Sequence, residues 1–216
     1  MIKVEYVDVW GFEHAIRGMR NPKNSWDKSD SEYSSEDEFV IGPNDLKLMR
    51  TLYKAGTEHR KYLRQIFVSM DITAPLYWWK EFDTYKVGTV ANSCSTMHKI
   101  ASKEFTIDDF SNEHLLKVSE LDKPSDYSPY VALMYIIAIL NEYRDKYNET
   151  KDNGYWWQLI QLLPSSYNQK RTVTMNYENV MTVINQRTGH KLDEWNELVK
   201  ILRTLPYVEA IRSEEE

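Results

Sequence analysis

A short alternating segment followed by a proline most constrains how this chain folds. Apolar residues occupy every second position from Ile66 to Ile72: Ile66, Val68, Met70 and Ile72 on one side, with Phe67, Ser69 and Asp71 on the other. A period of two predicts a β-strand with one buried face. Pro75 ends that strand and can open the next helix, which we expect from Leu76 to about Lys86.

The expected helix is aromatic, and the stretch after it is polar. The aromatic residues are Tyr77, Trp78, Trp79, Phe82 and Tyr85, and the polar ones are Thr89, Asn92, Ser93, Ser95 and Thr96. A helix anchored by bulky side chains that leads into a polar loop is a common way to position a ligand site. An amphipathic core helix followed by an ordinary surface loop fits the same composition, so both interpretations stay open.

The rest of the chain reads as helix-rich with few strands. We expect a strand over 2–10, buried on one or both faces, and a polar loop insertion over 21–42. Helices are expected over 12–20, 43–56, 128–151, 156–163, 176–187 and 192–205, with short helical pieces over 105–122 and a solvated tail at 214–216. The long helix is apolar all round in its first half, so it must be buried in the core or at a subunit interface. The predicted class is α+β, one domain over 1–216, with a small mixed or antiparallel sheet.

Net charge, cysteine content and the length of apolar runs argue against several classes of protein. A net charge of −6 over 216 residues disfavours a binder of nucleic-acid polymers, although a local basic pocket for a small phosphate ligand remains possible. The single cysteine, Cys94, allows no intrachain disulfide and favours a reducing compartment. The longest apolar run, Tyr130 to Leu140, is shorter than the about 20 residues that span a bilayer.

Two further expectations concern location and metals. The first residues lack the charged and then apolar order of a signal peptide, so we expect a cytoplasmic protein without membrane contact. The five histidines show no HxxxH or HxH spacing, and no metal site is expected. They are His14, His59, His98, His114 and His190.

Three segments carry a resemblance to a known family. The first segment contains His59, ahead of the alternating strand. The second is the strand itself, with Pro75 and the aromatic helix, which lead to Asn92 and Ser95. The third begins at Leu163-Pro164 and continues to Thr174, Asn176, Arg187 and Trp195. In order and in approximate spacing, these segments resemble the flavin-dependent thymidylate synthases (the ThyX family). Arg20 and Ser25 resemble an earlier Ala-Arg-x-Ser element of that family, with an insertion between them. The similarity covers most of the chain, but no single motif is intact.

The resemblance implies a fold, an activity and a set of site residues. The family converts dUMP to dTMP with FAD, methylene-tetrahydrofolate and NADPH, and it works as a homotetramer with active sites between subunits. Arg187 matches the arginine that binds and activates the pyrimidine. Ser95 matches the serine that binds the substrate phosphate, with Lys86 as a second phosphate contact. The flavin-side positions are His59, Asn176, Lys86 and His190, and the substrate-side positions are Ser95, Asn92, Glu81 and Arg187.

Departures from the family motif leave the activity open. Thr84-Tyr85-Lys86 stands where the family has Arg-His-Arg, and a lysine cannot reproduce the bidentate grip of arginine. A family Glu is replaced by Arg64 and a family Arg by Glu178, which suggests charges relocated within one pocket if the two lie close together. The chain is therefore either a divergent flavin-dependent enzyme acting on a uridine or related pyrimidine nucleotide, or a non-catalytic nucleotide-binding or oligomeric assembly module on the same scaffold.

Simpler structural roles compete at four of these positions. Ser95 can cap local backbone, and Asn176 is a plausible helix N-cap. Arg187 can serve as a helix C-terminal charge in a salt bridge. His190 lies one place from the matching family histidine and can be an ordinary half-buried side chain.

Overall fold

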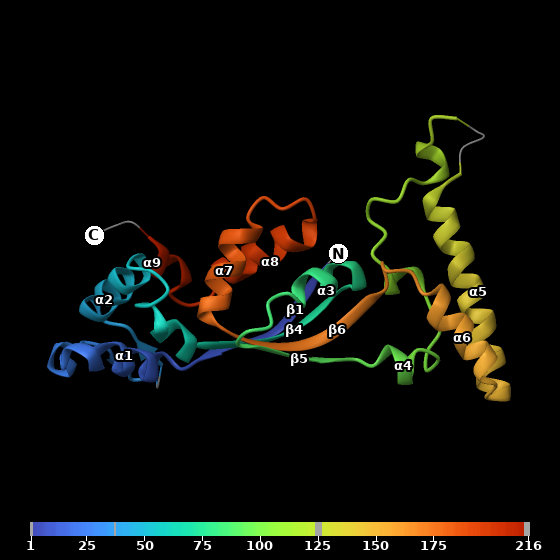
Figure 1. Ribbon diagram of the computed structural model, residues 1–216. Helices are drawn as coiled ribbons and strands as arrows, with labels where there is room; N and C mark the ends of the chain where they lie inside the picture. The colour runs from blue at the N-terminus through green and yellow to red at the C-terminus, as the bar shows by residue number, and fades with distance from the viewer. Residues whose placement is uncertain (1, 37, 124–126, 214–216) are drawn as a thin grey trace. The chain divides into compact units, whose positions relative to one another are not determined.

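Helices and a small sheet make up the chain, which confirms the predicted α+β class (Figure 1). The computed structural model describes residues 2–36, 38–123 and 127–213; the expected tail at 214–216 lies outside them. Contacts divide the chain into two compact units. Unit 1 comprises Met1–Lys3, Ile72–Thr84 and Asn92–Arg171, and unit 2 comprises Val4–Asp71, Tyr85–Ala91 and Thr172–Glu216.

The predicted alternating strand is present as β4 (Phe67–Pro75), with Val68, Met70 and Ile72 buried. The sheet has the order β1-β4-β6-β5. Its other strands are β1 (Lys3–Trp10), β5 (Thr89–Ser93) and β6 (Asn168–Asn176). The Thr174 hydroxyl donates to Ser69 Oγ at 3.1 Å and the Thr172 hydroxyl to Asp71 Oδ1 at 2.6 Å. Residue numbers rise along β4 as they fall along β6, so this pair is antiparallel.

Strand β1 confirms the predicted element but not its burial. Its side chains are exposed or half-buried along the whole length. The reason is its position, because β1 is an edge strand that pairs only with β4. Alternation in the sequence identified the strand but could not tell an edge from the middle of the sheet.

The aromatic helix after Pro75 is shorter than predicted. Helix α3 spans Leu76–Phe82 and not Leu76 to Lys86. The backbone N–H groups of Asp83 and Thr84 donate to Trp79 O at 2.9 Å and Glu81 O at 3.1 Å, which tightens the last turn and closes the helix. Trp78, Trp79 and Phe82 are buried against one another, as expected of packing mass.

The polar stretch that follows was expected to be a loop, and this expectation is wrong. It contains β5 and the short helix α4 (Thr96–Lys99). Strand β5 is the other edge of the sheet, and four of its five residues are exposed. Backbone pairing holds such a strand without any apolar face, so its sequence looks like a loop.

In unit 1, a long helix packs on a short one (Figure 1). These are α5 (Pro129–Thr150), predicted over 128–151 and capped in the structure by Ser128, and α6 (Asn153–Leu162). The turns η4 (Ile107–Asp109) and η5 (Val118–Glu120) precede them. Leu133, Ile137 and Leu140 of α5 are buried in this core. Met134, Tyr135 and Ile139 lie on the same helix and are exposed. The core of the chain therefore covers only one face of α5.

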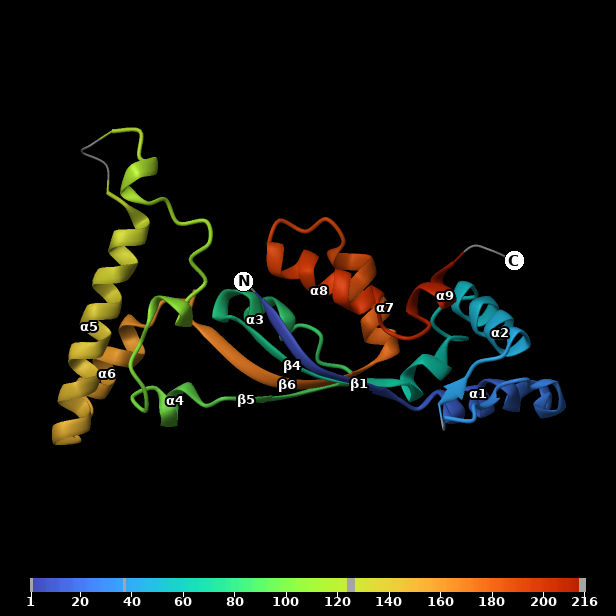
Figure 2. The same cartoon turned by 180° about the vertical axis from the view of Figure 1, so that it is seen from behind.

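In unit 2, helices pack in pairs, α7 with α8 and α2 with α9 (Figure 2). Apart from two short 3₁₀ helices in the segment over 21–42, the described helices of this unit are α1 (Phe12–Arg20), α2 (Pro43–Lys54), η3 (Lys61–Gln65), α7 (Tyr177–Arg187), α8 (Asp193–Arg203) and α9 (Val208–Arg212). All but η3 and α9 were predicted. None of the described helices combines the length and apolar character needed to cross a bilayer.

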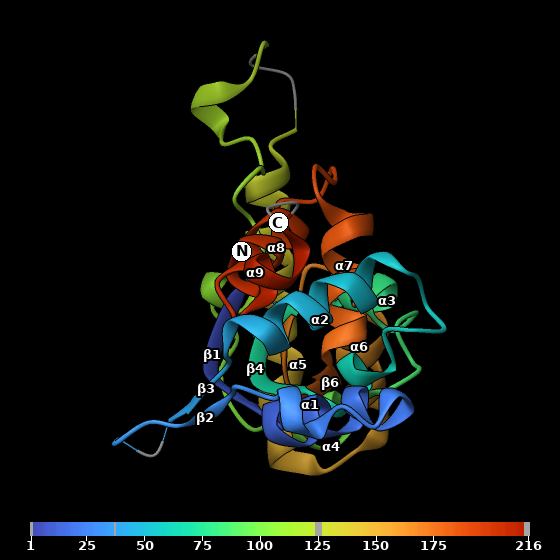
Figure 3. The same cartoon turned by 90° about the vertical axis from the view of Figure 1, so that its left-hand side faces the viewer.

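The sequence predicted a polar loop over 21–42, but the structure has short regular elements there. The segment contains η1 (Asn21–Lys23), η2 (Trp26–Lys28) and a hairpin of β2 (Glu32–Tyr33) with β3 (Phe39–Val40), which can be followed in Figure 3.

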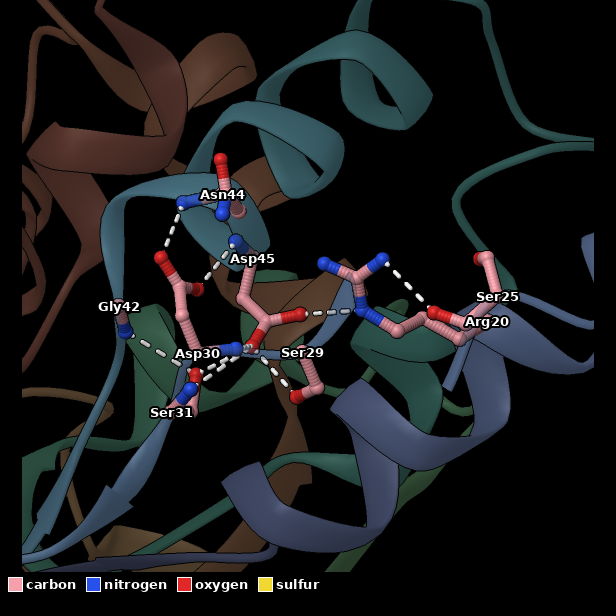
Figure 4. A network of polar contacts seen from close by, with 8 residues as sticks. All are labelled: Arg20, Ser25, Ser29, Asp30, Ser31, Gly42, Asn44 and Asp45. Carbon is pink, nitrogen blue, oxygen red and sulfur yellow. Dashed lines mark hydrogen bonds and ion pairs between the residues drawn. The ribbon is translucent and has the colours of Figure 1, made fainter. Parts of the chain in front are cut away.

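The buried carboxylate of Asp45 holds this segment onto α2. Arg20 Nε donates to Asp45 Oδ1 at 2.6 Å, and the hydroxyls of Ser29 and Ser31 donate to Oδ2 at 2.7 and 2.6 Å. Figure 4 shows these contacts. The backbone N–H groups of Asp30 and Ser31 donate to the same oxygen. Burial alone would raise the pKa of Asp45, but the hydrogen bonds from Ser31, Ser29 and Arg20 outweigh it and lower that pKa.

Candidate functional site

Arg187, at the end of α7, is held by three side chains of unit 2. Its Nε donates to the Tyr85 hydroxyl at 2.9 Å, and its Nη1 lies 3.1 Å from His190 Nε2. The guanidinium carbon lies 4.4 Å from the centroid of the Trp195 ring and 5.6 Å from that of Tyr85. We call Arg187, Tyr85, His190 and Trp195 the Arg187 clamp. Two aromatic rings and a hydroxyl fix the direction of the guanidinium.

Tyr85 is a residue of the Arg187 clamp that the sequence comparison did not single out. It occupies the middle position of the family's Arg-His-Arg, where its presence counted as a loss. In the structure its hydroxyl accepts from Arg187 and donates to Gln186 Oε1 at 2.9 Å. The replacement therefore puts an aromatic hydroxyl beside Arg187, which by the resemblance matches the family's pyrimidine-binding arginine.

Asn176 caps α7, as the simpler alternative predicted. Its side-chain oxygen accepts from Asn179 N at 3.0 Å. The Asn179 side chain donates to Val87 O at 2.5 Å and to Thr89 Oγ1 at 2.8 Å. These bonds hold the segment around Lys86, whose own side chain is exposed, next to the start of α7.

His59 lines a basic pocket between α1, α2 and η3. The cavity measures about 580 Å³. Its charged lining residues are Lys23, Lys61, Arg64 and Glu58. Three cations against one carboxylate make this pocket, called the His59 pocket, suited to an anionic group.

Arg64 and Glu178 lie close together, as the idea of relocated charges requires. Arg64 Nε forms an ion pair with Glu178 Oε2, and its Nη2 donates to Oε1 at 3.4 Å. Arg60 Nε lies 3.5 Å from the same Oε1. Arg64 also lines the His59 pocket. The carboxylate of Glu178 thus neutralises part of the positive charge at the edge of that pocket.

Ser95 lines a second pocket, which lies within unit 1. The cavity measures about 310 Å³. Ser95 also caps α4 by accepting from His98 N at 3.2 Å, so the simpler role is present as well. The polar and charged residues that share this Ser95 pocket are Thr73, Thr96, Ser102, Lys99, Lys103, Lys170, Tyr167, Asn168, Gln169, Asp108 and Asp109.

Three lysines line the Ser95 pocket and make it basic: Lys99, Lys103 and Lys170. Lys103 is ion-paired with Asp109, and the hydrogen bond to that carboxylate raises the pKa of Lys103. Lys170 reaches the pocket because the β6 backbone pairs with the chain next to Ser95: Cys94 N donates to Lys170 O at 2.9 Å. With hydroxyls and amides around them, these cations form a lining that suits a phosphate group.

The remaining predicted residues lie at more exposed positions. Asn92 is exposed on the edge strand β5, and Glu81 is half-buried on α3. Cys94 is a free, exposed thiol. Within the described ranges, no three His, Cys, Asp or Glu side chains gather into a group that could hold a metal ion.

The predicted residues fall into two sets. Ser95, Asn92 and Glu81 belong to unit 1, while Arg187, His190, Asn176, Lys86 and His59 belong to unit 2. Within unit 2, the structure brings Arg187 and His190 together. The lining of the His59 pocket includes none of the other four.

Comparison with known proteins identifies the fold. No protein-family model and no curated protein sequence matches the chain. Thymidylate Synthase X (ThyX) from Helicobacter pylori, solved with FAD and dUMP, matches over 99% of this chain and 100% of its own, with a TM-score of 0.65 and 14% identity. The UMP/dUMP methylase PolB from Streptomyces cacaoi, bound with 5-Br UMP, matches over 94% and 88%, with a TM-score of 0.62 and 16% identity. The chain therefore has the fold of the flavin-dependent thymidylate synthase ThyX.

Proposed function

We propose that this protein binds a pyrimidine nucleotide through the Ser95 pocket and is a divergent flavin-dependent enzyme of the ThyX type. One observation carries the proposal. Ser95, which matches the phosphate-binding serine of the family, shares a cavity with Lys99, Lys103 and Lys170. These lysines compensate for the missing Arg-His-Arg cations from other positions in the chain.

The charge balance of the pocket fits a phosphate monoester. Three lysines face Asp108 and Asp109 in the lining, so the pocket carries a net positive charge. A nucleotide monophosphate brings a charge of about −2 near neutral pH. Lysines act on the phosphate as point charges and hydroxyls act as hydrogen-bond donors. These contacts fix the phosphate less firmly than the bidentate hydrogen bonds of two arginines.

FAD is the cofactor that the remaining residues fit. The basic lining of the His59 pocket suits the pyrophosphate of FAD, and the Arg187 clamp presents a fixed cation of the kind that a pyrimidine oxygen needs. When bound, the flavin supplies the redox chemistry, and the protein supplies binding and orientation. NADPH and methylene-tetrahydrofolate complete the reaction as co-substrates. The H. pylori ThyX structure holds FAD and dUMP, which supports this choice.

A non-catalytic nucleotide-binding or assembly module is the second candidate. The exposed apolar side chains of α5, Met134, Tyr135 and Ile139, favour it because they suit contact with further copies of the chain. The loss of Arg-His-Arg also favours it. A homo-oligomer, a homotetramer by the resemblance, fits both candidates, since the ThyX active site lies between subunits.

Two titrations of the full-length protein test the proposal. Calorimetry with dUMP is expected to show binding that deoxyuridine, which lacks the phosphate, does not share. Lys170→Ala is expected to weaken dUMP binding about tenfold through loss of one charge-assisted contact. Lys54→Ala, an exposed lysine of α2 outside the pocket, is the matched control. Equal binding of dUMP and deoxyuridine overturns the Ser95 pocket as a phosphate site.

The second titration uses FAD and separates the two candidates. Two results together support the enzyme. The reconstituted protein absorbs at about 450 nm, as expected for bound oxidised flavin. It also forms dTMP, and Arg187→Lys abolishes this activity. Nucleotide binding without flavin binding or turnover supports the module. Turnover that survives Arg187→Lys contradicts the role of the Arg187 clamp.

A further inference from the structure

An aromatic groove in unit 2 lies apart from the two pockets described above. It measures about 580 Å³, within the usual range for small-molecule sites. The end of β1, the start of α1 and the β2–β3 hairpin form it together with residues 206–207. Its lining is Val9, Trp10, Gly11, Phe12, Glu13, His14, Tyr33, Glu38, Phe39, Val40, Pro206 and Tyr207. None of these is a residue of the Ser95 pocket, the His59 pocket or the Arg187 clamp.

Five of the twelve lining residues are aromatic, and each of their rings packs against another aromatic ring. Tyr33 and Phe39, paired across the hairpin, have centroids 5.1 Å apart, and Phe12 and Tyr207 have centroids 5.4 Å apart. Trp10 stacks on Phe67, which lies outside the lining, at 5.9 Å. Even so, Trp10 is 44% exposed and Tyr33 57% exposed. The groove thus offers fixed ring surfaces that the chain itself leaves open to a ligand.

The charge of the groove is negative. Glu13 and Glu38 line it, and no lysine or arginine is among the described residues that do. Glu13 Oε2 accepts a hydrogen bond from the Tyr33 hydroxyl at 3.0 Å, and this bond to the carboxylate raises the pKa of Tyr33. Arg17, one turn further along α1, contacts the His14 ring at 3.4 Å but is not a lining residue. The carboxylates therefore face a groove without an internal countercharge.

We propose that this groove binds a small organic cation of the quaternary ammonium class, with its methyl groups against the rings of Trp10 and Tyr33 and its charge near Glu13 and Glu38. A methylated ammonium has no N–H donors to satisfy, and it is attracted both by the faces of aromatic rings and by carboxylates. A primary amine loses more hydration on entering such a groove, and an anion is repelled. The inference does not depend on nucleotide or flavin binding.

Choline and its neutral carbon isostere test the proposal on the full-length protein. Choline and 3,3-dimethylbutan-1-ol have nearly the same shape and differ in the charge of the head group. Saturation-transfer NMR is expected to show transfer to the methyl protons of choline and little to those of the isostere. Equal transfer to both compounds means that the groove binds them only as an apolar cleft, which overturns the proposal. Absence of transfer to choline also overturns it.

Paired variants locate the binding. Trp10→Leu is expected to weaken choline binding about 2- to 30-fold, the range of a cation–π contact, and Glu38→Gln is expected to weaken it as well. The matched controls are Trp157→Leu, at a tryptophan that is 50% exposed in unit 1, and Glu149→Gln, at an exposed carboxylate of α5. Both variants must unfold like the parent protein. If neither Trp10→Leu nor Glu38→Gln then changes choline binding, the cation binds elsewhere and the assignment is contradicted.

Discussion

Arg64 and Glu178 form an ion pair with the signs reversed relative to the ThyX family, which by the resemblance has Glu at the first position and Arg at the second. The pair is made by Arg64 Nε with Glu178 Oε2 and by Nη2 with Oε1 at 3.4 Å. By the resemblance, each of the two positions carries the opposite charge in the family. Glu178 also interacts with a second cation, since Arg60 Nε lies 3.5 Å from its Oε1.

Reversing this pair tests whether the exchange is compensated. Arg64→Glu puts a second carboxylate beside Glu178 and is expected to lower the free energy of unfolding only slightly, because the Arg64 side chain is solvent-exposed. Glu178→Arg is expected to cost more, since it faces both Arg60 and Arg64. The double reversal is expected to be more stable than the sum of the single effects, although Arg60 limits the recovery. A double-mutant cycle in urea measures this coupling, and strictly additive losses contradict it.

The Asp45 carboxylate is expected to be a main source of stability in unit 2. Asp45→Asn leaves Arg20 buried without its countercharge, so we expect a loss of about 3–5 kcal/mol in the free energy of unfolding. Asp27→Asn, at an exposed carboxylate of η2, is the matched control and is expected to change little. Urea unfolding measures both variants. Similar stability of the two shows that the network of Figure 4 contributes little.

The same carboxylate is expected to make stability sensitive to acid. The pKa of Asp45 is lowered in the folded protein, so the folded state favours the ionised form. The resulting stabilisation is present above the unfolded-state pKa of about 3.9 and is lost as the pH falls through the lower folded-state pKa. The stability difference between the parent protein and Asp45→Asn should therefore be flat above about pH 5 and shrink below about pH 4. A difference that grows toward low pH contradicts this sign.

The sequence predicted the elements whose apolar residues face a core. Strand β4 was identified from its alternation because one face is buried, and α5, predicted over 128–151, spans Pro129–Thr150. Strand β5 was missed because both of its faces are largely exposed, so backbone pairing leaves no periodic signal. Helix α9, with five residues, is too short for its period to be read.

The candidate site was predictable only in part, for a related reason. Ser95, Lys99 and Lys103 recur every four residues, a signal that was available in the sequence and was not used. Lys170 joins them through strand pairing across a long stretch of chain, which local spacing cannot show. The partnership of Tyr85 with Arg187 was equally hidden, because the family comparison recorded only that a histidine had been replaced.

Gly88 is expected to be required for the capping of α7. Its φ is +72°, and a Cβ added there would lie 2.3 Å from Asn176 Nδ2. Gly88→Ala is therefore expected to cost about 1–3 kcal/mol, from backbone strain together with a disturbed N-cap. Gly189→Ala is the matched control, since its φ of +74° is similar and nothing lies within 4 Å of the added Cβ. Thermal unfolding should show the larger loss for Gly88→Ala; equal losses mean that strain alone is responsible.

The exposed apolar face of α5 is expected to hold copies of the chain together. Met134, Tyr135 and Ile139 are all exposed on this helix, and Tyr135 is 70% exposed. The double variant Met134→Glu, Ile139→Glu places two charges in such a contact without touching the buried Leu133, Ile137 and Leu140, so it should dissociate the assembly and leave each chain folded. Sedimentation velocity and circular dichroism measure the two outcomes, with Thr57→Glu, at an exposed position of unit 2, as the control. A folded variant with the mass of the parent assembly shows that α5 is not the contact.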